Sequence, residues 1–252
     1  PYEDVLRIIQ PFHCILSRSE TRVNKEMIEA APELKVIARA GVGVGNIDVE
    51  YATERGILVI NTPGKNTNSA AELTMGLLLS AFRKIVPAHQ SMQSLNWDRH
   101  RFNGGELMNK CLGIIGLGNV GHRVARYAKA FDMKVQAFDP YLADEVFERH
   151  GVQKVDWITL LNTSDVITFH VPLNDETRGM ISEMEIERMK PGVILLNTAR
   201  GGVINETSLL NALHSGHVAA AGIDTWEVEP PRDNPFSQLP QVVMSPHIGA
   251  ST

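Results

Sequence analysis

Three glycines between an apolar run and an amphipathic segment constrain the fold of this chain more than any other feature. Gly116, Gly118 and Gly121 match the pattern G-x-G-x-x-G, directly after the apolar run 112–115 and before a helical pattern at 120–131. In a strand–turn–helix unit, these glycines allow a tight turn, close approach of a pyrophosphate, and close packing of helix on strand. The helix N-terminus adds amide donors for the phosphate. The pattern predicts a Rossmann-type dinucleotide site, and a glycine-rich turn without a ligand is the alternative.

An acidic residue follows the next predicted strand. Asp139 stands 18 residues after Gly121, at the end of the run 134–138. A carboxylate in this place accepts hydrogen bonds from ribose hydroxyls and repels a 2′-phosphate, so NAD is the predicted cofactor rather than NADP. The alternative role for Asp139 is that of a turn residue before Pro140.

Short apolar runs alternate with amphipathic segments along nearly the whole chain, which indicates parallel α/β structure. A turn-rich break at 61–66 separates two units. The first has predicted strands at 12–16, 34–38 and 57–60 and helices at 24–30 and 49–55. The second has six predicted strands, at 111–115, 134–138, 166–169, 193–196, 219–223 and 242–244, and helices at 69–91, 119–131, 144–150, 182–189 and 205–215. The predicted fold class is therefore α/β, with a Rossmann-type doubly wound parallel sheet and a smaller α/β unit.

Local signals refine three of these helices. Pro87 lies inside the predicted helix 69–91 and should kink or break it. Ser182 and Glu185 form a capping box at the start of the helix 182–189, and Asn205 is an N-cap candidate.

Composition excludes several classes of function. The 252 residues carry a net charge of -5 without a block of Lys and Arg, so we expect no nucleic-acid partner. No apolar run reaches the roughly 18 residues of a membrane span, and no membrane partner is expected. Cys14 and Cys111 lie in apolar runs, where buried free thiols are expected, and no metal-ligand spacing is present. These features fit a cytoplasmic enzyme, and the start at Pro1 suggests a sequence that begins inside a longer protein.

Three titratable or charged residues in the last quarter of the chain could carry chemistry. Arg200, Glu229 and His247 each lie in a loop after a predicted strand, where open α/β sheets bind ligands. Oxidation of an alcohol needs a base for the hydroxyl proton, and histidine suits this near neutral pH. A neighbouring carboxylate stabilises the protonated imidazole, and an arginine can hold a substrate carboxylate by two parallel hydrogen bonds. A structural arginine, a solvated loop acid and a hydrogen-bonded loop histidine are the alternatives.

The motifs around these residues resemble the D-isomer-specific 2-hydroxyacid dehydrogenase family. They are Ala199-Arg200-Gly201-Gly202, Asp224-x-x-x-x-Glu229-Pro230-Pro231 and Pro246-His247-Ile248-Gly249. The resemblance covers essentially the whole chain, and within the family it is greatest to the phosphoglycerate dehydrogenase branch. It implies hydride transfer between NAD and a small 2-hydroxy acid, here D-3-phosphoglycerate, in serine biosynthesis. It also implies a partial, flavodoxin-like substrate domain at 1–62 and an NAD-binding domain at 63–252, with a dimerisation arm at about 69–109 and a homodimer or higher homo-oligomer.

The resemblance further assigns residue roles. Arg200 would bind the substrate carboxylate and carbonyl, His247 would be the acid/base, and Glu229 its partner. The implied cofactor contacts are Gly116, Gly118, Asn119, Val120, Gly121, Asp139, His170, Val171, Pro172, Thr198, Ala199, Asp224, Gly249 and Ala250. The implied substrate contacts are Arg18, Arg39, Gly41, Val42, Gly43, Asn66 and Arg99. Arg18 and Arg39 would bind the substrate phosphate, with Arg99 reaching in from a partner subunit, since an arginine fork suits phosphate. Ordinary surface arginines are the alternative for all three.

The chain also departs from the family pattern. Gly45 stands where the family usually has an acid. The chain begins after the family's first strand and helix and stops at Thr252, before its C-terminal helix, so we expect the small domain to be incomplete. Two other functions stay open: a glyoxylate or hydroxypyruvate reductase, or another D-2-hydroxyacid dehydrogenase, and more remotely an NAD-sensing scaffold similar to the C-terminal binding protein corepressors.

Overall fold

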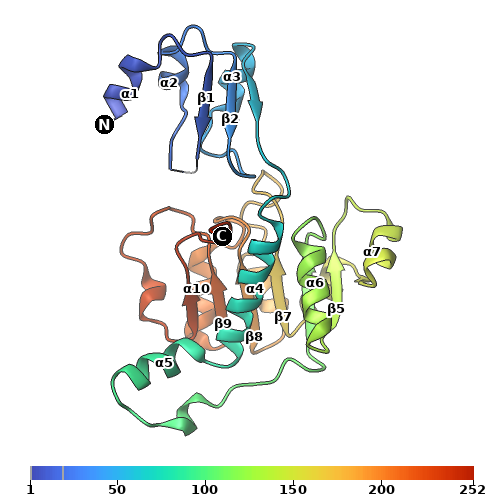
Figure 1. Ribbon diagram of the computed structural model, residues 1–252. Helices are drawn as coiled ribbons and strands as arrows, with labels where there is room; N and C mark the ends of the chain where they lie inside the picture. The colour runs from blue at the N-terminus through green and yellow to red at the C-terminus, as the bar shows by residue number, and fades with distance from the viewer. Residues whose placement is uncertain (1, 19) are drawn as a thin grey trace. The chain divides into compact units, whose positions relative to one another are not determined.

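The computed structural model describes residues 2–18 and 20–252. Contacts divide the chain into two compact units, Pro1–Asn66 and Thr67–Thr252, each with its own sheet and core. Figure 1 labels their helices and strands.

Unit 1 is a small three-stranded parallel sheet with helices. Its elements are α1 (Tyr2–Ile8), β1 (Cys14–Ser17), α2 (Lys25–Glu29), β2 (Val36–Arg39), α3 (Val49–Glu54) and β3 (Leu58–Ile60), and the strand order is β1-β2-β3. Strand side chains alternate between two faces. Ile15 and Ile37 point into the core with Met27 and Ile28 of α2, while Leu16 is 76% exposed. Cys14 shares the exposed face, so the prediction of a buried thiol there is wrong.

Unit 2 contains a seven-stranded, all-parallel sheet. Its strands are β4 (Cys111–Ile115), β5 (Lys134–Phe138), β6 (Gln153–Lys154), β7 (Val166–Phe169), β8 (Val193–Asn197), β9 (Val218–Ile223) and β10 (Val242–Met244). The order β10-β9-β8-β7-β4-β5-β6 is that of a Rossmann fold with one added edge strand. The predicted α/β Rossmann-type fold is therefore confirmed. The six-strand prediction is one short, because β6 has only two residues and gives no apolar run.

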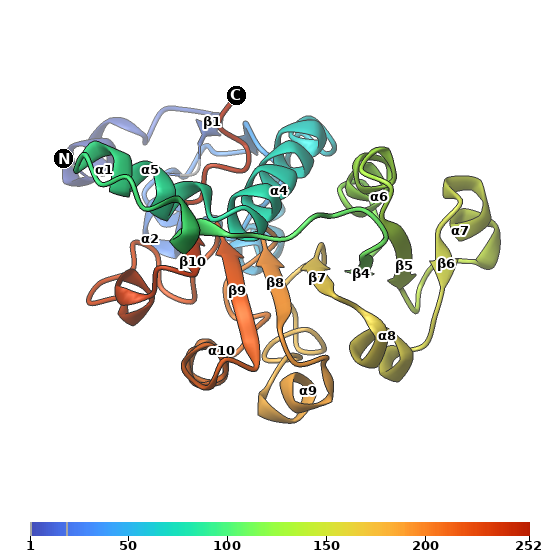
Figure 2. The same cartoon turned by 90° about the horizontal axis from the view of Figure 1, so that it is seen from below.

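Helices cover both faces of this sheet, as Figure 2 shows. One face packs against α4 (Thr67–Phe82) and α6 (Gly121–Ala130), and the other against α8 (Trp157–Thr163) and α10 (Glu206–Ser215), with α9 (Glu183–Arg188) beside α10. The helix α7 (Asp144–His150) follows β5 at the sheet edge. Each face has its own buried cluster, around Leu78, Ile114 and Val124 on one side and around Leu160, Ile186 and Leu209 on the other. Such strands, buried on both sides, read as continuous apolar runs.

The predicted long helix 69–91 is two helices, α4 and α5 (Ile85–Gln93). The break lies at Lys84, which has a positive φ of 52°, rather than at Pro87. Pro87 then falls in the first turn of α5, where a missing N–H removes no helical hydrogen bond. The chain continues through the short helix η1 (Arg99–Phe102) and returns to the end of α4, where Gly105 N donates to Phe82 O.

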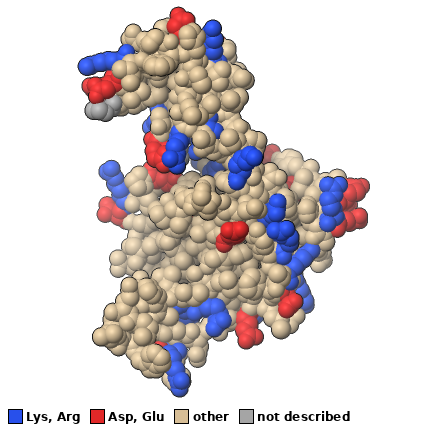
Figure 3. Space-filling model, in the orientation of Figure 1, with Lys and Arg blue, Asp and Glu red and all other residues tan. Residues whose placement is uncertain are grey.

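Charged side chains are spread over the face that Figure 3 shows, with Lys and Arg near Asp and Glu and no extended area of one sign. Within the described residues, no helix is long and apolar enough to span a membrane.

Candidate active site

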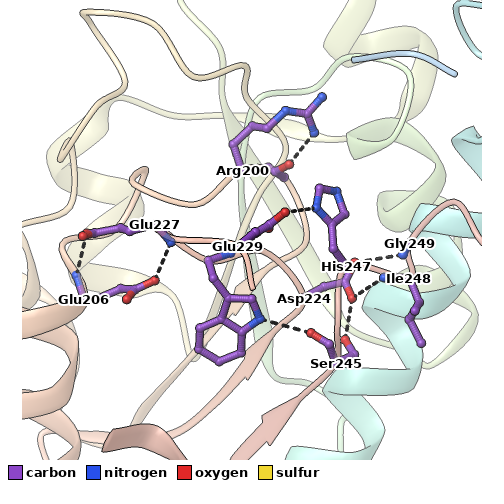
Figure 4. A network of polar contacts seen from close by, with 11 residues as sticks. Arg200, Glu206, Asp224, Glu227, Glu229, Ser245, His247, Ile248 and Gly249 are labelled. Atoms are coloured by element: carbon purple, nitrogen blue, oxygen red, sulfur yellow. Dashed lines mark hydrogen bonds and ion pairs between the residues drawn. The ribbon is translucent and has the colours of Figure 1, made fainter. Parts of the chain in front are cut away.

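The strand order brings three predicted site residues onto neighbouring loops. Arg200 follows β8, Glu229 follows β9 and His247 follows β10, and these strands are adjacent and parallel. Their carboxyl ends therefore meet at one edge of the sheet. Figure 4 shows the three side chains, with contacts that join the Glu229 loop to the His247 loop and a bond of Arg200 within its own turn.

Glu229 and His247 are in direct contact. His247 Nδ1 lies 2.7 Å from Glu229 Oε2, and both side chains are partly exposed. With a carboxylate on Nδ1, the proton of a neutral ring sits on Nδ1, and Nε2 is left as the acceptor. The backbone of His247 has a positive φ of 53°, a conformation that few residues other than glycine and asparagine adopt readily.

Asp224, the first residue after β9, fixes the loop that carries His247. Its carboxylate is fully buried and accepts hydrogen bonds from Ser245 Oγ (2.6 Å), Ile248 N (2.9 Å) and Gly249 N (2.8 Å). Its carbonyl accepts from His247 N at 2.9 Å. These bonds hold the unusual backbone conformation of His247 from both sides.

Trp226 connects the Glu229 loop to both of its neighbours. Its main-chain N–H donates to Glu229 Oε1 at 3.1 Å, and its ring Nε1 donates to Ser245 O at 3.2 Å. On the other side, Gly201 touches it so closely that a Cβ there would lie 1.8 Å from Trp226 O. The loop carrying Arg200 and the loop carrying Glu229 thus meet main chain to main chain.

Arg200 itself is held by its own turn. Nη1 donates to Ala199 O at 2.6 Å, and the buried Asn197 side chain accepts from Ala199 N (3.1 Å) and donates to Arg200 O (2.9 Å). Asn197 was not among the residues predicted from the sequence, although an amide residue at the end of a buried strand was a usable signal.

The glycine turn has the geometry that its pattern predicts. Gly116 has φ +90°, and a Cβ there would lie 2.7 Å from His170 O; a Cβ at Gly121 would lie 2.1 Å from Gly116 O. At Gly118, in contrast, a Cβ would meet no heavy atom within 4 Å, so the surface of this glycine is open to a ligand. Asn119 and Val120 complete the turn before α6, which begins at Gly121.

The predicted ribose carboxylate is fixed against this turn. Asp139 Oδ2 accepts from Leu117 N at 2.9 Å, and Oδ1 accepts from Tyr141 N at 3.1 Å. Across the switch point of the sheet, His170 bonds Thr168 Oγ1 at 3.0 Å, and burial of its ring lowers the pKa of His170 to about 3. This histidine is neutral at physiological pH and is followed by Val171 and Pro172, whose predicted cofactor contacts stay predictions.

The buried Thr74 hydroxyl lies at hydrogen-bond distance from the hydroxyl of Thr198. Thr74 Oγ1, on α4, donates to Ala70 O at 2.8 Å and lies 2.8 Å from Thr198 Oγ1. Because a hydroxyl has one proton, a Thr74 hydroxyl that donates to Ala70 O accepts from Thr198, which then offers only lone pairs to a further partner. Thr74 was not predicted from the sequence, because it lies in an ordinary helical pattern.

Unit 1 organises its candidate arginines around one asparagine. Arg39 Nε donates to Asn46 Oδ1 at 3.0 Å, and Asn46 Nδ2 donates to the carbonyls of Arg18 (2.9 Å) and Thr21 (2.6 Å). The guanidinium of Arg39 lies where a Cβ of Gly41 would be, at 1.6 Å. A side chain at position 41 would therefore displace the Arg39 guanidinium from this place.

The remaining substrate candidates lie on loops. Val42 O accepts from Asn61 Nδ2 at 2.6 Å, Gly43 is half-buried in the same loop, and Asn66 is the last residue of unit 1. Arg99, in η1, and Ala250, after His247, are exposed. Among residues 2–18 and 20–252, no group of three or more His, Cys, Asp or Glu side chains could hold a metal ion.

Comparison with known proteins decides the family. Residues 75–249 match the NAD-binding domain of the D-isomer-specific 2-hydroxyacid dehydrogenases. The chain belongs to this family. The predicted family and its cofactor, NAD, are thereby confirmed.

Three relatives illustrate the range of the family around this chain. D-3-phosphoglycerate dehydrogenase from Archaeoglobus fulgidus is 50% identical over 99% of this chain and 48% of its own length. Hydroxypyruvate reductase from Thermotoga maritima is 46% identical over 99% of this chain and 82% of its own length. A crystal structure of D-lactate dehydrogenase from Aquifex aeolicus, complexed with NAD and lactic acid, matches with a TM-score of 0.87 and 30% identity, over all of this chain and 79% of that one. The chain spans about half the length of the phosphoglycerate dehydrogenases it matches.

Proposed function

We propose that the intact protein is an NAD-dependent D-2-hydroxyacid dehydrogenase that oxidises D-3-phosphoglycerate to 3-phosphohydroxypyruvate. The observation that carries this proposal is the contact of 2.7 Å between Glu229, in the loop after β9, and His247, in the loop after β10. An imidazole held in one tautomer by a carboxylate, beside an arginine, supplies a base and an anion clamp in one place.

His247 is the proposed base. Its Nε2 takes the proton of the substrate hydroxyl, and Glu229 stabilises the imidazolium that forms through the bond to Nδ1. Bound NAD would supply the hydride acceptor for the carbon that bears this hydroxyl. In the reverse direction His247 returns the proton to the carbonyl oxygen.

Arg200 is the proposed clamp for the substrate carboxylate and carbonyl. One guanidinium N–H is used by Ala199 O, which fixes the direction of the side chain. The other N–H groups are the donors proposed for the substrate.

The chain's own residues fit the cofactor at the glycine turn. The open surface of Gly118 and the amides that begin α6 suit a pyrophosphate, and the Asp139 carboxylate suits the adenosine ribose. The further proposed contacts are Gly116, Asn119, Val120, Gly121, His170, Val171, Pro172, Thr198, Ala199, Asp224, Gly249 and Ala250. Asp224 would act here through the loop it holds, because its two oxygens already accept three hydrogen bonds.

Substrate choice rests on the arginines. We propose that the substrate phosphate binds Arg18 and Arg39 of unit 1, the proposed substrate-binding domain, with Gly41, Val42, Gly43 and Asn66 as further contacts. The bond that Arg39 Nε donates to Asn46 Oδ1 restricts the Arg39 side chain, so less rotamer freedom is lost on binding. Arg99 of a second subunit is proposed to add a charge.

A hydroxypyruvate reductase is the second candidate. It is favoured by the relative of that name, of which this chain covers 82%. A substrate without a phosphate would not need Arg18 and Arg39, and this difference separates the two candidates.

One substrate panel tests both. The intact protein is assayed with D-3-phosphoglycerate and NAD or NADP, and with hydroxypyruvate and glyoxylate and the reduced cofactors. We expect NAD-dependent oxidation of D-3-phosphoglycerate, and Arg39→Ala should raise its KM while leaving that for hydroxypyruvate unchanged. Activity with hydroxypyruvate or glyoxylate alone, unaffected by Arg39→Ala, would overturn the substrate assignment.

The acid/base role has its own test. We expect His247→Asn to lower kcat by about 10²–10⁴-fold with little change in the Kd for NAD. Asparagine is chosen because it tolerates the positive φ at this position, so the loop stays in place. A wild-type kcat in this variant would refute the role of His247.

The wider setting is proposed as well. The arm at about 69–109 exposes Leu95 (88%) and Trp97 (77%), apolar surface suited to a second copy of the chain, and we propose a homodimer or higher homo-oligomer. A reaction that makes 3-phosphohydroxypyruvate belongs to serine biosynthesis, for which we propose a cytoplasmic location.

A further inference from the structure

Two glutamates beside the proposed catalytic pair form a reciprocal contact. Glu206 is the first residue of α10, and Glu227 lies in the loop after β9. Glu206 Oε1 accepts from Glu227 N at 2.8 Å, and Glu227 Oε1 accepts from Glu206 N at 3.2 Å, as Figure 4 shows. Each carboxylate thus binds the main chain of the other residue, and we call this pair the glutamate clasp.

The clasp holds two like charges together by means of main-chain donors. Burial raises the pKa of Glu206, the bond from the Glu227 amide opposes that rise, and the Glu227 carboxylate adds to it. The N-terminus of the ten-residue α10 and the two amides favour negative charge at this point. Each carboxylate accepts a main-chain N–H, and these two bonds offset the repulsion between the like charges.

The clasp acts on the segment that carries Glu229. Glu227 stands next to Trp226, whose N–H holds Glu229 Oε1 at 3.1 Å, and two residues before Glu229 itself. The segment is fixed at its start by Asp224 N, which donates to Asn197 O at 2.9 Å. Trp226 Nε1 fixes the middle of the segment by its bond to Ser245 O. The clasp fixes the next residue, Glu227, which lies two residues before Glu229.

We propose that Glu206 and Glu227 are positioning residues for the Glu229–His247 pair, and that their reciprocal main-chain bonds hold Glu229 at hydrogen-bond distance from the imidazole. This inference rests on the proposed function, because it assumes that Glu229 and His247 act together as the acid/base pair. Neither glutamate is in contact with His247 in the described network, so both act through the loop.

The test uses two alanine variants and a charge-neutral control in the intact protein. Glu206→Ala and Glu227→Ala each remove one bond of the clasp. We expect kcat to fall by about 10- to 100-fold in each, since a displacement of up to 1 Å has effects of that size, while the Kd for NAD is unchanged. Glu206→Gln keeps an oxygen that can accept from Glu227 N, and should restore most of the kcat.

A spectroscopic measurement reports on the pair without turnover. The ¹⁵N chemical shift of His247 Nδ1, followed by NMR, should move in both alanine variants toward its value in Glu229→Gln, because the carboxylate has moved away from Nδ1. Glu183→Ala is the matched control: Glu183 is the first residue of α9, as Glu206 is of α10, but its side chain is exposed. It should change neither kcat nor the Nδ1 chemical shift.

The outcomes separate this inference from the function beneath it. A wild-type kcat and Nδ1 chemical shift in both alanine variants would overturn the positioning role. Equal losses in Glu206→Ala and Glu206→Gln would also overturn it, because the main-chain bond would then be irrelevant. A wild-type kcat in His247→Asn would instead refute the proposed function. Glu227 is exposed, so its alanine variant gives a readout even if Glu206→Ala fails to fold.

Discussion

Gly201→Ala should damage both stability and catalysis, because the Arg200 turn and the Glu229 loop touch at this glycine. A Cβ at 201 would lie 1.8 Å from Trp226 O and 2.0 Å from Trp226 C. Real Cβ contacts do not fall below 3.0 Å, so one main chain must move by about 1.2 Å. The opposing atoms are backbone and cannot rotate away, so we expect a loss near 3 kcal/mol, the upper part of the usual range for overpacking.

The same movement reaches Glu229 and His247, the proposed catalytic pair. Trp226 N holds Glu229 Oε1, so a displaced Trp226 pulls the carboxylate from His247. A misplacement of about 1 Å lowers rates by roughly 10²-fold, and we expect a fall of that size in kcat. A loss of about 3 kcal/mol corresponds to a drop in Tm of about 6–12 °C for a domain of this size.

Thermal unfolding and initial-rate assays measure the two effects. Gly76→Ala is the control: it lies in α4, a Cβ there meets no atom within 4 Å, and replacing a helical glycine should stabilise by about 1 kcal/mol. If Gly201→Ala melts with the wild type and keeps its kcat, the described contact between the two loops is not what positions Glu229.

Variants at three further positions test other contacts. Asp139→Ala should raise the KM for NAD about 10- to 30-fold and reduce the preference for NAD over NADP. The reason is the loss of two proposed hydrogen bonds to the ribose hydroxyls, of about 1 kcal/mol each. An unchanged KM for NAD in initial-rate assays contradicts the ribose contact. Burial alone would raise the pKa of Asp165, but hydrogen bonds from the Cys111 amide and from Lys190 lower the pKa overall. The ionised carboxylate therefore stabilises the fold at a pH above its pKa in the unfolded chain, and this stabilisation is lost as the pH falls through its pKa in the folded protein. The Tm difference between wild type and Asp165→Asn should therefore be largest at pH 7 and shrink below about pH 4. Thr74→Val should lower the stability by about 1 kcal/mol in thermal unfolding, since it leaves the Thr198 hydroxyl without its acceptor, and Thr74→Ser should not.

Elements with strong periodicity were predictable from the sequence, and elements set by tertiary contacts were not. The strands 134–138, 166–169 and 242–244 and the capping box at Ser182 are found as predicted, because each is encoded in a local run of residues. The two-residue β6 and the exposed Cys14 depend on which neighbour a strand meets, and no local pattern records that. The break before Pro87 shows that a proline constrains where a helix can begin as much as where it must end.

The same distinction applies to the site. Arg200, Glu229 and His247 could be singled out because their chemistry is unusual in a loop after a strand. Thr74 and Glu206 could not, because each has a common role in its own helix and gains its partner only when the chain folds. Asn197 was missed although its place at the end of a buried strand was a usable signal.

The network at the carboxyl edge of the sheet consists mainly of side-chain oxygens that accept main-chain N–H bonds. Asp224 binds Ile248 and Gly249 in this way, and Glu229 binds Trp226. The Asp224 carboxylate is fully buried, so salt screens its bonds to the His247 loop little. The surface arginines proposed for the phosphate are open to screening. The bonds that hold the His247 loop and the proposed attraction of an anionic substrate therefore have separate physical origins. We expect substitutions of the arginines to change substrate preference without disturbing the Glu229–His247 contact.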